Sequence, residues 1–397
     1  MALPQKVKRW AFYNFANHSY QLGYVAFLLP VFFSTVLLSK GFSLGAWGVA
    51  NGVSTVIGVV IAIVVGRYSD RHSKLTAFRW SVACTFAGMA AVALLSAFPS
   101  WWMFGAFIAT NAFLIWSISL SDSILPHVSE GKTSYEYGGF AWGLGYAGGA
   151  ASLLVILALQ KFTGDNSLAV FLSVPIFYAI FSWYSLAGLA GESFKEPEAA
   201  VKTVFISKRN KGILLLGYWF ISECVTVISL FAALYLSGEM HFSELQVGIA
   251  FLFIQIVGFP ATWIGGRLVK YYSSLKLLGW SICVWGVAMA LFLSSHGNTF
   301  GLWAAIFLLG LVYGNTQSYL RSQYSTIVQR SESGFQFGIY SVMSEAAVFV
   351  GPIVFGYASD ALHSQRTPLI FLFGFMMLGY GLIWKIMHRK NASTEGA

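Results

Sequence analysis

Long runs of apolar residues dominate the pattern of hydrophobic and polar positions, and short polar stretches separate them. Twelve runs begin near Trp10, Leu44, Phe78, Trp101, Tyr137, Ser167, Lys211, Glu244, Leu275, Thr299, Phe335 and Pro368. Because a helix needs about 20 apolar residues to cross a bilayer, each run is long enough for one membrane span. The pattern therefore predicts an all-α membrane protein with about twelve transmembrane helices.

The composition agrees with a membrane protein. Hydrophobic residues make up 57% of the 397 residues and charged residues only 10%, whereas soluble domains average about 25% charged residues. The first run, from Trp10 to about Leu38, is too long for the core of a signal peptide, so we expect it to remain in the protein. Cys84, Cys224 and Cys283 lie in apolar runs at unrelated spacings, so we expect no disulfide framework, no metal site and no cofactor.

The placement of basic residues predicts the orientation. All of the 24 lysines and arginines fall on one side of the predicted spans except Lys40, Lys161 and Arg366. By the positive-inside rule, both termini are expected to be cytoplasmic. The net charge of +9 is spread over short loops, which favours contact with anionic lipid headgroups and excludes a nucleic-acid-binding face. We expect a monomeric multi-pass protein of a bacterial cytoplasmic (inner) membrane.

An internal repeat appears when the chain is compared with itself at an offset of 200 residues. The matched positions are Phe42-Ser43 and Phe242-Ser243, Gly48 and Gly248, Gly66-Arg67 and Gly266-Arg267, and Gly138 and Gly338. Chance matching is the alternative, because glycine and serine are common in membrane helices. Six spans followed by six in the same orientation is typical of transporters built from two halves. We predict two six-helix bundles, at 1–191 and 212–397, joined by a cytoplasmic linker at 192–211.

The loop after the second run carries a G-x-x-x-D-R-x-x-K pattern, formed by Gly66, Asp70, Arg71 and Lys74. This pattern resembles the signature loop of the major facilitator superfamily, although an ordinary charged turn is the alternative. Gly66 would let the helix end approach a neighbour closely. Asp70 could accept hydrogen bonds from exposed amides at a helix N-terminus and pair with a nearby arginine. The resemblance implies a role in conformational gating. Lys270 replaces the aspartate in the second half, so a one-sided contact is expected.

Four further motifs resemble the vacuole-effluxer branch of that superfamily, which includes autophagy-type vacuolar amino-acid exporters and bacterial permeases. They are Tyr13-Asn14-Phe15-Ala16-Asn17; Ile124-Leu125-Pro126 with Gly138-Gly139 and the stretch Gly143 to Gly149; Gln317 with Arg321-Ser322; and the stretch Phe337 to Ser341 with Gly351-Pro352. The chain departs from the branch at Asn14, where an acid is usual, and at Glu345, in a span where lysine is usual. We also expect Arg321 to take part in gating.

Several polar residues fall at the expected depth of the bilayer midplane, where they are costly unless they face a cavity or a partner. They are His18, Asn111, Glu223, Gln255 and Glu345. Asn14, Asn17, Trp142, Tyr146 and Tyr340 complete the candidate substrate-binding and ion-binding set. Aligning Tyr13-Asn14-Phe15 with Tyr218-Trp219-Phe220 places His18 opposite Glu223 in the repeat, and the resemblance implies that both line a central cavity. The alternative for His18 is a satisfied hydrogen bond between helices.

These features predict a secondary active transporter that moves a small polar organic solute, such as an amino acid or peptide, by alternating access with protons as the coupling ion. The sequence has no nucleotide-binding loop of the G-x-x-x-x-G-K-[ST] type. It also has no H-E-x-x-H or G-x-S-x-G motif, so we do not expect an enzyme. The alternative is a non-transporting membrane sensor or a membrane-embedded enzyme on a transporter-like fold. The glycine pairs Gly139 and Gly143, and Gly145 and Gly149, are interpreted as sites of close helix packing.

Overall fold

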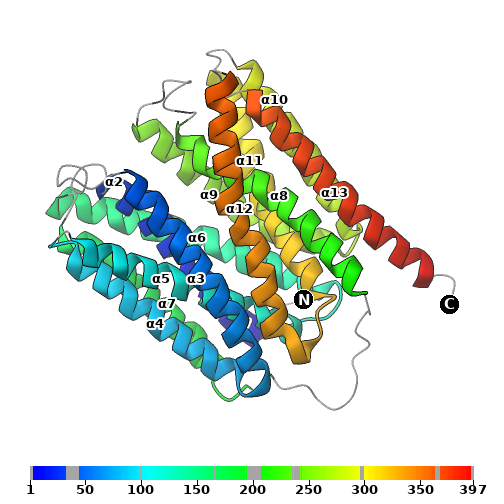
Figure 1. Cartoon of the computed structure of the whole chain (residues 1–397), viewed down its shortest axis with the longest axis horizontal. Helices are drawn as coiled ribbons and strands as arrows, with labels where there is room; N and C mark the ends of the chain where they lie inside the picture. Colours follow the sequence, from blue (N-terminus) through cyan, green and yellow to red (C-terminus); the bar gives the residue numbers. More distant parts are fainter. Residues whose placement is uncertain are drawn as a thin grey trace. The chain divides into compact units, whose positions relative to one another are not determined.

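The computed structural model describes residues 3–32, 44–98, 100–164, 167–192, 207–234, 244–295, 299–362 and 367–394, with Phe194, Leu236 and Phe242 as single positions between them. Every regular element in these ranges is a helix (Figure 1). The all-α prediction is therefore confirmed. Ten of the described helices are long and apolar enough to cross a membrane. The total of twelve spans and the cytoplasmic termini stay predictions.

The described part of the first predicted span contains three elements. They are α1 (Gln5–His18), the π-helix η1 (Ser19–Leu28) and α2 (Leu29–Phe32). The next five long helices are α3 (Leu44–Arg71), α4 (Lys74–Leu95), α5 (Trp101–Val128), α6 (Thr133–Thr163) and α7 (Leu168–Gly188). After the predicted linker come α8 (Lys208–Leu234), α9 (Glu244–Leu268), α10 (Ser274–Ser294), α11 (Thr299–Ser325), the short 3-10 helix η5 (Arg330–Glu332), α12 (Ser333–Leu362) and α13 (Thr367–Thr394).

Helix starts repeat at the offset that the sequence predicted. Helix α6 begins at Thr133 and α12 at Ser333, while α4 begins at Lys74 and α10 at Ser274. The last pair shares a cap, because Ser73 Oγ accepts from the Thr76 amide at 3.2 Å and Ser273 Oγ from the Lys276 amide at 3.3 Å. These N-caps start α4 a turn earlier than its apolar run, since capping satisfies amides that have no partner within the helix.

The chain forms two compact units. Unit 1 contains Met1–Glu130, Phe140–Val201 and Val328–Ser341, and unit 2 contains Gly131–Gly139, Lys202–Ile327 and Val342–Ala397. Each unit therefore includes one helix start from the other sequence half. We call Gly131–Gly139 the exchanged end of α6 and Val328–Ser341 the exchanged end of α12. The predicted linker at 192–211 lies largely outside the described residues, so the predicted domain division stays a prediction.

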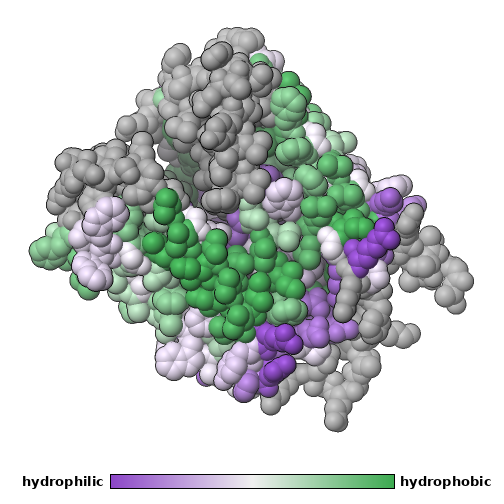
Figure 2. Space-filling view, viewed as in Figure 1, coloured by the Kyte–Doolittle hydropathy of each residue, from purple (hydrophilic) through white to green (hydrophobic). Residues whose placement is uncertain are grey.

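Small residues allow close helix packing in unit 1, where α4 lies against α5 and α7, and α3 against α5 (Figure 1). A Cβ atom at Gly58 of α3 would lie 2.9 Å from Ile115 and 3.0 Å from the Cα atom of Ala112 in α5. Such contacts are the usual way that membrane helices approach one another. The other surface of α3 is apolar, and Figure 2 shows hydrophobic residues along it with hydrophilic residues at its end. This distribution suits a helix in a bilayer.

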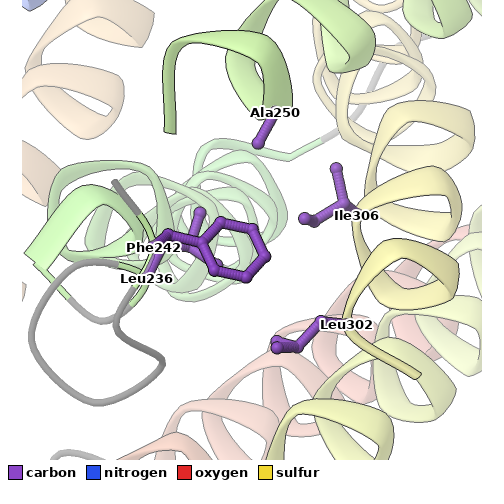
Figure 3. Packing of buried hydrophobic residues seen from close by; sticks show 5 residues of the cluster. All are labelled: Leu236, Phe242, Ala250, Leu302 and Ile306. Carbon is purple, nitrogen blue, oxygen red and sulfur yellow. The ribbon is translucent and has the colours of Figure 1, made fainter. Parts of the chain in front are cut away.

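Unit 2 has a similar packing of α9 against α11 and of α8 against α13. An apolar cluster joins the start of α9 to the start of α11 (Figure 3). In it the Phe242 ring points toward Ile306 and Leu302, while Ala250 and Leu236 close the cluster. Because these side chains bury apolar surface away from solvent, they hold the two helix starts together.

Candidate functional site

His18 forms the centre of a polar cluster inside the first predicted span. It is the last residue of α1, directly before the π-helical segment η1. Its Nδ1 atom lies 3.0 Å from the carbonyl oxygen of Asn14 and 2.8 Å from Oδ1 of Asn17. A carbonyl oxygen only accepts, so Nδ1 carries a proton in this geometry. π-Helical segments are rare and often occur at functional sites.

Helix α6 provides the surface on which the His18 ring lies. The ring centroids of Trp142 and Tyr146 are 6.0 and 6.2 Å from that of His18, both in edge-on geometry. Gly145 lies between them in the sequence, and a Cβ atom there would collide with the imidazole. The structure thus brings Asn14, Asn17, His18, Trp142 and Tyr146 together.

The glycine-rich face of α6 continues beyond Gly145. A Cβ atom at Gly148 would collide with the backbone of Phe15, and one at Gly149 would lie 3.2 Å from Leu22. In unit 2, a Cβ atom at Gly139 would lie 2.6 Å from the carbonyl oxygen of Thr262. The interpretation of Gly139, Gly145 and Gly149 as sites of close packing is confirmed.

Asn111 is partnered without any ligand. Its Nδ2 donates to Ser54 Oγ at 2.7 Å and links α5 to α3 within unit 1. This hydrogen bond accounts for the amide at this depth, because a polar group in a bilayer needs a partner. A hydrogen bond between helices therefore explains why Asn111 is present. The same kind of explanation covers the polar residues of α1 only in part.

The buried polar candidates of unit 2 are less well satisfied. Glu223 in α8 is 2% exposed, and neither of its carboxylate oxygens accepts a hydrogen bond from the described residues. The side-chain oxygen of Gln255 in α9 is in the same situation. Glu345 in α12 is half-buried. Burying an unpartnered carboxylate is costly, so Glu223 in particular needs an explanation beyond packing.

Two predictions about a central cavity are not tested by the structure. His18 belongs to unit 1 and Glu223 to unit 2, so their meeting across a cavity stays a prediction. Tyr340 belongs to the exchanged end of α12, where its ring packs edge-on against Phe337 at 5.9 Å. It is therefore placed beside another aromatic residue, and its role in lining a cavity also stays a prediction.

Asp70 holds the exchanged end of α12 in unit 1. Its Oδ1 and Oδ2 atoms accept hydrogen bonds from the amides of Gly334 and Phe335, both at 2.8 Å. These amides belong to the first turn of α12 and have no partner within the helix, and the negative charge also suits the helix dipole. Only glycine fits at position 66, because a Cβ atom on Gly66 would overlap the Gly334 carbonyl. The expectation that Asp70 accepts from helix N-terminal amides is confirmed.

The predicted arginine partner of Asp70 was wrong. Asp70 forms its ion pair with Lys74, four residues later, while Arg71 is exposed. Residues four apart on adjoining helical turns face one another, whereas neighbouring residues point in different directions. Lys74 is buried beside the carboxylate, so it and not Arg71 completes the contact. We call this arrangement of Gly66, Asp70, Lys74 and the α12 start the α12-end contact.

A second contact of opposite polarity holds the exchanged end of α6 in unit 2. Glu136 is 5% exposed, and its carboxylate lies 3.2 Å from Nε of Arg267 and 2.6 Å from Nζ of Lys270. Arg321 supports the same helix end by donating from Nη2 to the carbonyl oxygen of Gly138 at 2.9 Å. We call this arrangement the α6-end contact. The prediction of a one-sided contact was wrong, because Lys270 has an acid to pair with.

Sequence reasoning missed Glu136 although a signal was present. Glu136 is the fourth residue of α6, and Gln336 at the 200-residue offset is the fourth residue of α12. The loop position changes from Asp70 to Lys270 at the same offset. The repeat copy that has a lysine in place of Asp70 therefore has an acid at the helix position that this lysine faces.

Sequence reasoning also missed Arg330, which anchors the exchanged end of α12. Its guanidinium donates to the carbonyl oxygen of Pro126 and to Glu130, both at 2.7 Å. His127 Nε2 lies 3.2 Å from Ser333 Oγ at the first residue of α12. These contacts fix the α12 start against the end of α5. In the described residues, no group of three or more histidine, cysteine or acidic side chains could hold a metal ion.

Comparison with known proteins places this geometry in a wider context. A family model described as "Vacuole effluxer Atg22 like" matches residues 134–396. Autophagy-related protein 22 of Candida glabrata is 23% identical over 310 residues, covering 73% of this chain and 55% of the relative. Its Saccharomyces cerevisiae counterpart is 26% identical over 215 residues, covering 51% of this chain and 38% of the relative. The chain thus spans about a third to just over half of these relatives' lengths.

Solved structures resemble the whole chain at low sequence identity. The human organic anion transporter MFSD10 has a TM-score of 0.78 at 13% identity, with 96% of this chain and 99% of that chain covered. A bacterial homologue of the iron transporter ferroportin has a TM-score of 0.73 at 13% identity, covering 97% and 98%. The Escherichia coli fucose:proton symporter FucP has a TM-score of 0.71 at 14% identity, covering 97% of both chains. The chain therefore has the fold of major facilitator superfamily transporters.

Proposed function

The chain belongs to the Atg22-like vacuole effluxer family, and from this premise we propose that it is a secondary active transporter that moves a small polar organic solute by alternating access. The family and the fold are those of multi-pass membrane transporters. The three structural neighbours are named for an organic anion, iron and fucose with a proton. Because these cargoes share no chemistry, the fold does not select the substrate, and the residues of this chain have to.

The observation that carries the proposal is the carboxylate of Glu223. It lies within a membrane-spanning helix, is 2% exposed, and receives no hydrogen bond from the described residues. A carboxylate that served only to join helices would be paired, because an unpaired one costs several kcal/mol, on the order of the whole gain from a helix contact. A site that binds and releases a proton or a polar solute gives such a group its purpose.

The His18 cluster supports a polar organic solute in place of a bare ion. The His18 imidazole lies beside the backbone carbonyl of Asn14 and the side-chain amide of Asn17. Trp142 and Tyr146 provide aromatic surface next to the same ring. Ligand sites commonly combine a largely apolar wall with a few polar groups that fix orientation. Amino acids, small peptides and similar metabolites fit this mixture.

Orientation, coupling and location complete the proposal. We propose twelve spans with cytoplasmic termini, because the basic residues gather on one side of the predicted spans. Protons are the proposed coupling ion, carried by His18 and Glu223, and the transporter is proposed to act as a monomer. A bacterial cytoplasmic membrane remains the proposed location, on the sequence resemblance alone, since the curated relatives named above are fungal.

The test begins with purified protein and a thermal-shift screen of amino acids, peptides, sugars and organic acids. Ligands that raise the unfolding temperature are then tested for uptake into proteoliposomes, with and without an imposed proton gradient. Glu223→Gln should reduce both the shift and the uptake. Glu192→Gln is the matched control, because Glu192 is an exposed carboxylate outside the spans. Ligand binding without any flux would favour a non-transporting sensor, and turnover of the ligand would favour an enzyme.

A further inference from the structure

The two exchanged ends are held by the same geometry with the charges placed on opposite partners. In the α12-end contact, the acid is Asp70 at the end of α3, and the fourth residue of the helix start is the neutral Gln336. In the α6-end contact, the position equivalent to Asp70 is Lys270, and the fourth residue of the helix start is the acidic Glu136. The acid therefore lies at the end of α3 in the α12-end contact, but in the helix start itself in the α6-end contact.

The close packing beneath the charges is the same in both copies. A Cβ atom at Gly66 would overlap the carbonyl of Gly334 in the α12 start, and one at Gly266 would overlap the carbonyl of Tyr135 in the α6 start. The α12 start therefore lies directly on a glycine near the end of α3, and the α6 start lies on a glycine near the end of α9. With equal sterics, the charge arrangement is the feature that distinguishes the two contacts.

Helix electrostatics explains why both positions differ together, so that the helix start carries an acid where the residue it faces is a lysine. A helix N-terminus carries a partial positive charge, so an acid is favourable there and a lysine is not. Asp70 can bind the α12 start directly through its amides. Lys270 could not do the same at the α6 start. Glu136 solves this problem because it lies in the first turn of α6 and pairs with both Arg267 and Lys270.

We propose that Glu136 is a positioning residue of the transport cycle, and that it does for the α6 start in unit 2 what Asp70 does for the α12 start in unit 1. This inference rests on the proposed alternating-access function. Both contacts join residues from the two sequence halves, so a cycle that separates and rejoins the halves has to break and remake both. The two halves of the repeat thus carry equivalent contacts of opposite polarity.

Buried residues at equivalent positions of the repeat, next to the residues of each contact, provide matched probes. Ser69 and Val269 occupy equivalent positions in the repeat, and both are 2% exposed. Ser69 Oγ lies against Gly334, since a Cβ atom on Gly334 would be only 2.6 Å from this oxygen. In a variant with all three cysteines replaced by serine, Ser69→Cys and Val269→Cys report the opening of the α12-end and α6-end contacts. Their reaction rates with a hydrophilic maleimide in nanodiscs require no knowledge of the substrate.

Charge relocation tests the inference. Asp70→Lys should raise the reactivity of Ser69→Cys about tenfold or more, since it removes the two charge-assisted hydrogen bonds to the amides of the α12 start. Adding Gln336→Glu should return it to within about threefold of the parent, because the α12 start would then carry its own acid, as the α6 start does. In unit 2, Lys270→Asp should expose Val269→Cys, and adding Glu136→Gln should protect it again.

The controls separate charge pairing from general loosening. Gln336→Glu alone places a second acid near Asp70 and should raise reactivity, so rescue by the same substitution in the Asp70→Lys background is specific. Glu136→Gln and Asp70→Asn give milder versions if a charge reversal fails to yield monodisperse protein. If the paired variants react as fast as the single ones, the inference is overturned. If the paired variants regain protection but the parent protein moves no solute, the paired contacts stand and the transporter proposal is rejected instead.

Discussion

The carbonyl oxygen of Asn14 lies 3.0 Å from Nδ1 of His18, one turn later in α1. This contact sets the protonated nitrogen and the direction of the ring, because a carbonyl oxygen can only accept. The Cε1 edge of the ring, between its two nitrogens, lies on the surface of α6 at Gly145. The imidazole is therefore held by a backbone acceptor in α1 and by the absence of a side chain at Gly145 in α6.

Gly145→Ala is expected to impair solute binding about as strongly as His18→Ala. The added methyl group would occupy the place of the imidazole, so the ring must leave its position or α6 must move away from α1. A shift of about 1 Å in a binding group can cost roughly 100-fold in activity. The measurement is the ligand-induced thermal shift together with proteoliposome uptake.

Gly105→Ala in α5 is the matched control for that prediction. A Cβ atom at Gly105 would meet nothing within 4 Å, so the same chemical change there should leave binding and uptake unchanged. Equal losses in both variants would show that helix flexibility and not the His18 position is responsible. Full activity of Gly145→Ala would remove the ring position from the binding site.

Asp70→Asn is expected to slow transport by about tenfold while leaving the ranking of substrates unchanged. The asparagine keeps one acceptor oxygen but loses the charge that binds two amides and Lys74, and hydrogen bonds to charged groups contribute roughly 1.5–3 kcal/mol. Uptake rates for several competing solutes measure both quantities. An altered ranking would place Asp70 in the binding site itself.

Lys74 and Arg71 should behave differently although they belong to the same motif. Lys74 is buried and paired with Asp70, whereas Arg71 is exposed. Lys74→Gln is therefore expected to reproduce the effect of Asp70→Asn on transport rate, and Arg71→Gln to leave the rate within about twofold, as is usual for exposed charges. A larger loss in Arg71→Gln would restore the arginine to the gating contact.

The sequence predicted the helices because their signal is local. Apolar length depends only on nearby residues, and the structure confirms long helices at the predicted places. The polar set Asn14, Asn17 and His18 was also found from one segment. Its contact with Trp142 and Tyr146 became visible only when α1 and α6 were placed together.

The exchanged ends could be predicted only in part. The G-x-x-x-D-R-x-x-K pattern indicated Asp70 but gave the wrong cation, because adjacency in sequence suggested Arg71 while helical geometry selects Lys74. Glu136 is an isolated acid near a helix start, and its meaning depends on Lys270, which follows 134 positions later in the printed chain. Long-range pairs of this kind have no local pattern, and here only the internal repeat could have revealed one.

Glu345→Gln is expected to weaken binding of the native substrate by about tenfold with little change in yield. A half-buried carboxylate in a membrane helix favours neutral or cationic groups and disfavours anionic ones. The variant should therefore also bind organic anions better relative to the native substrate. Thermal-shift titrations with matched anionic and neutral solutes measure this. Unchanged binding and transport would remove Glu345 from the site.

The last prediction concerns the proton that drives transport. Imidazole and carboxylate side chains both bind and release protons, and Glu223 is a buried carboxylate without a hydrogen-bond donor among the described residues. A group that takes up a proton on one side of the membrane and releases it on the other couples the solute to the proton gradient. Neutralising either residue should therefore abolish proton-driven accumulation, and because both residues are also proposed to contact the solute, the downhill exchange that remains should be weaker than in the parent.

Solute flux against pH in proteoliposomes, with the proton gradient varied independently, makes this test for Glu223→Gln and His18→Ala. If the two residues only stabilise the fold, each variant should unfold at lower temperature while its remaining transport keeps the pH dependence of the parent. If they couple transport, the variants should remain folded and lose accumulation while exchange persists. Accumulation driven by protons in both variants would exclude this pair, and Glu345 in α12 would then be the next carboxylate to test, because α12 is one of the twelve predicted spans.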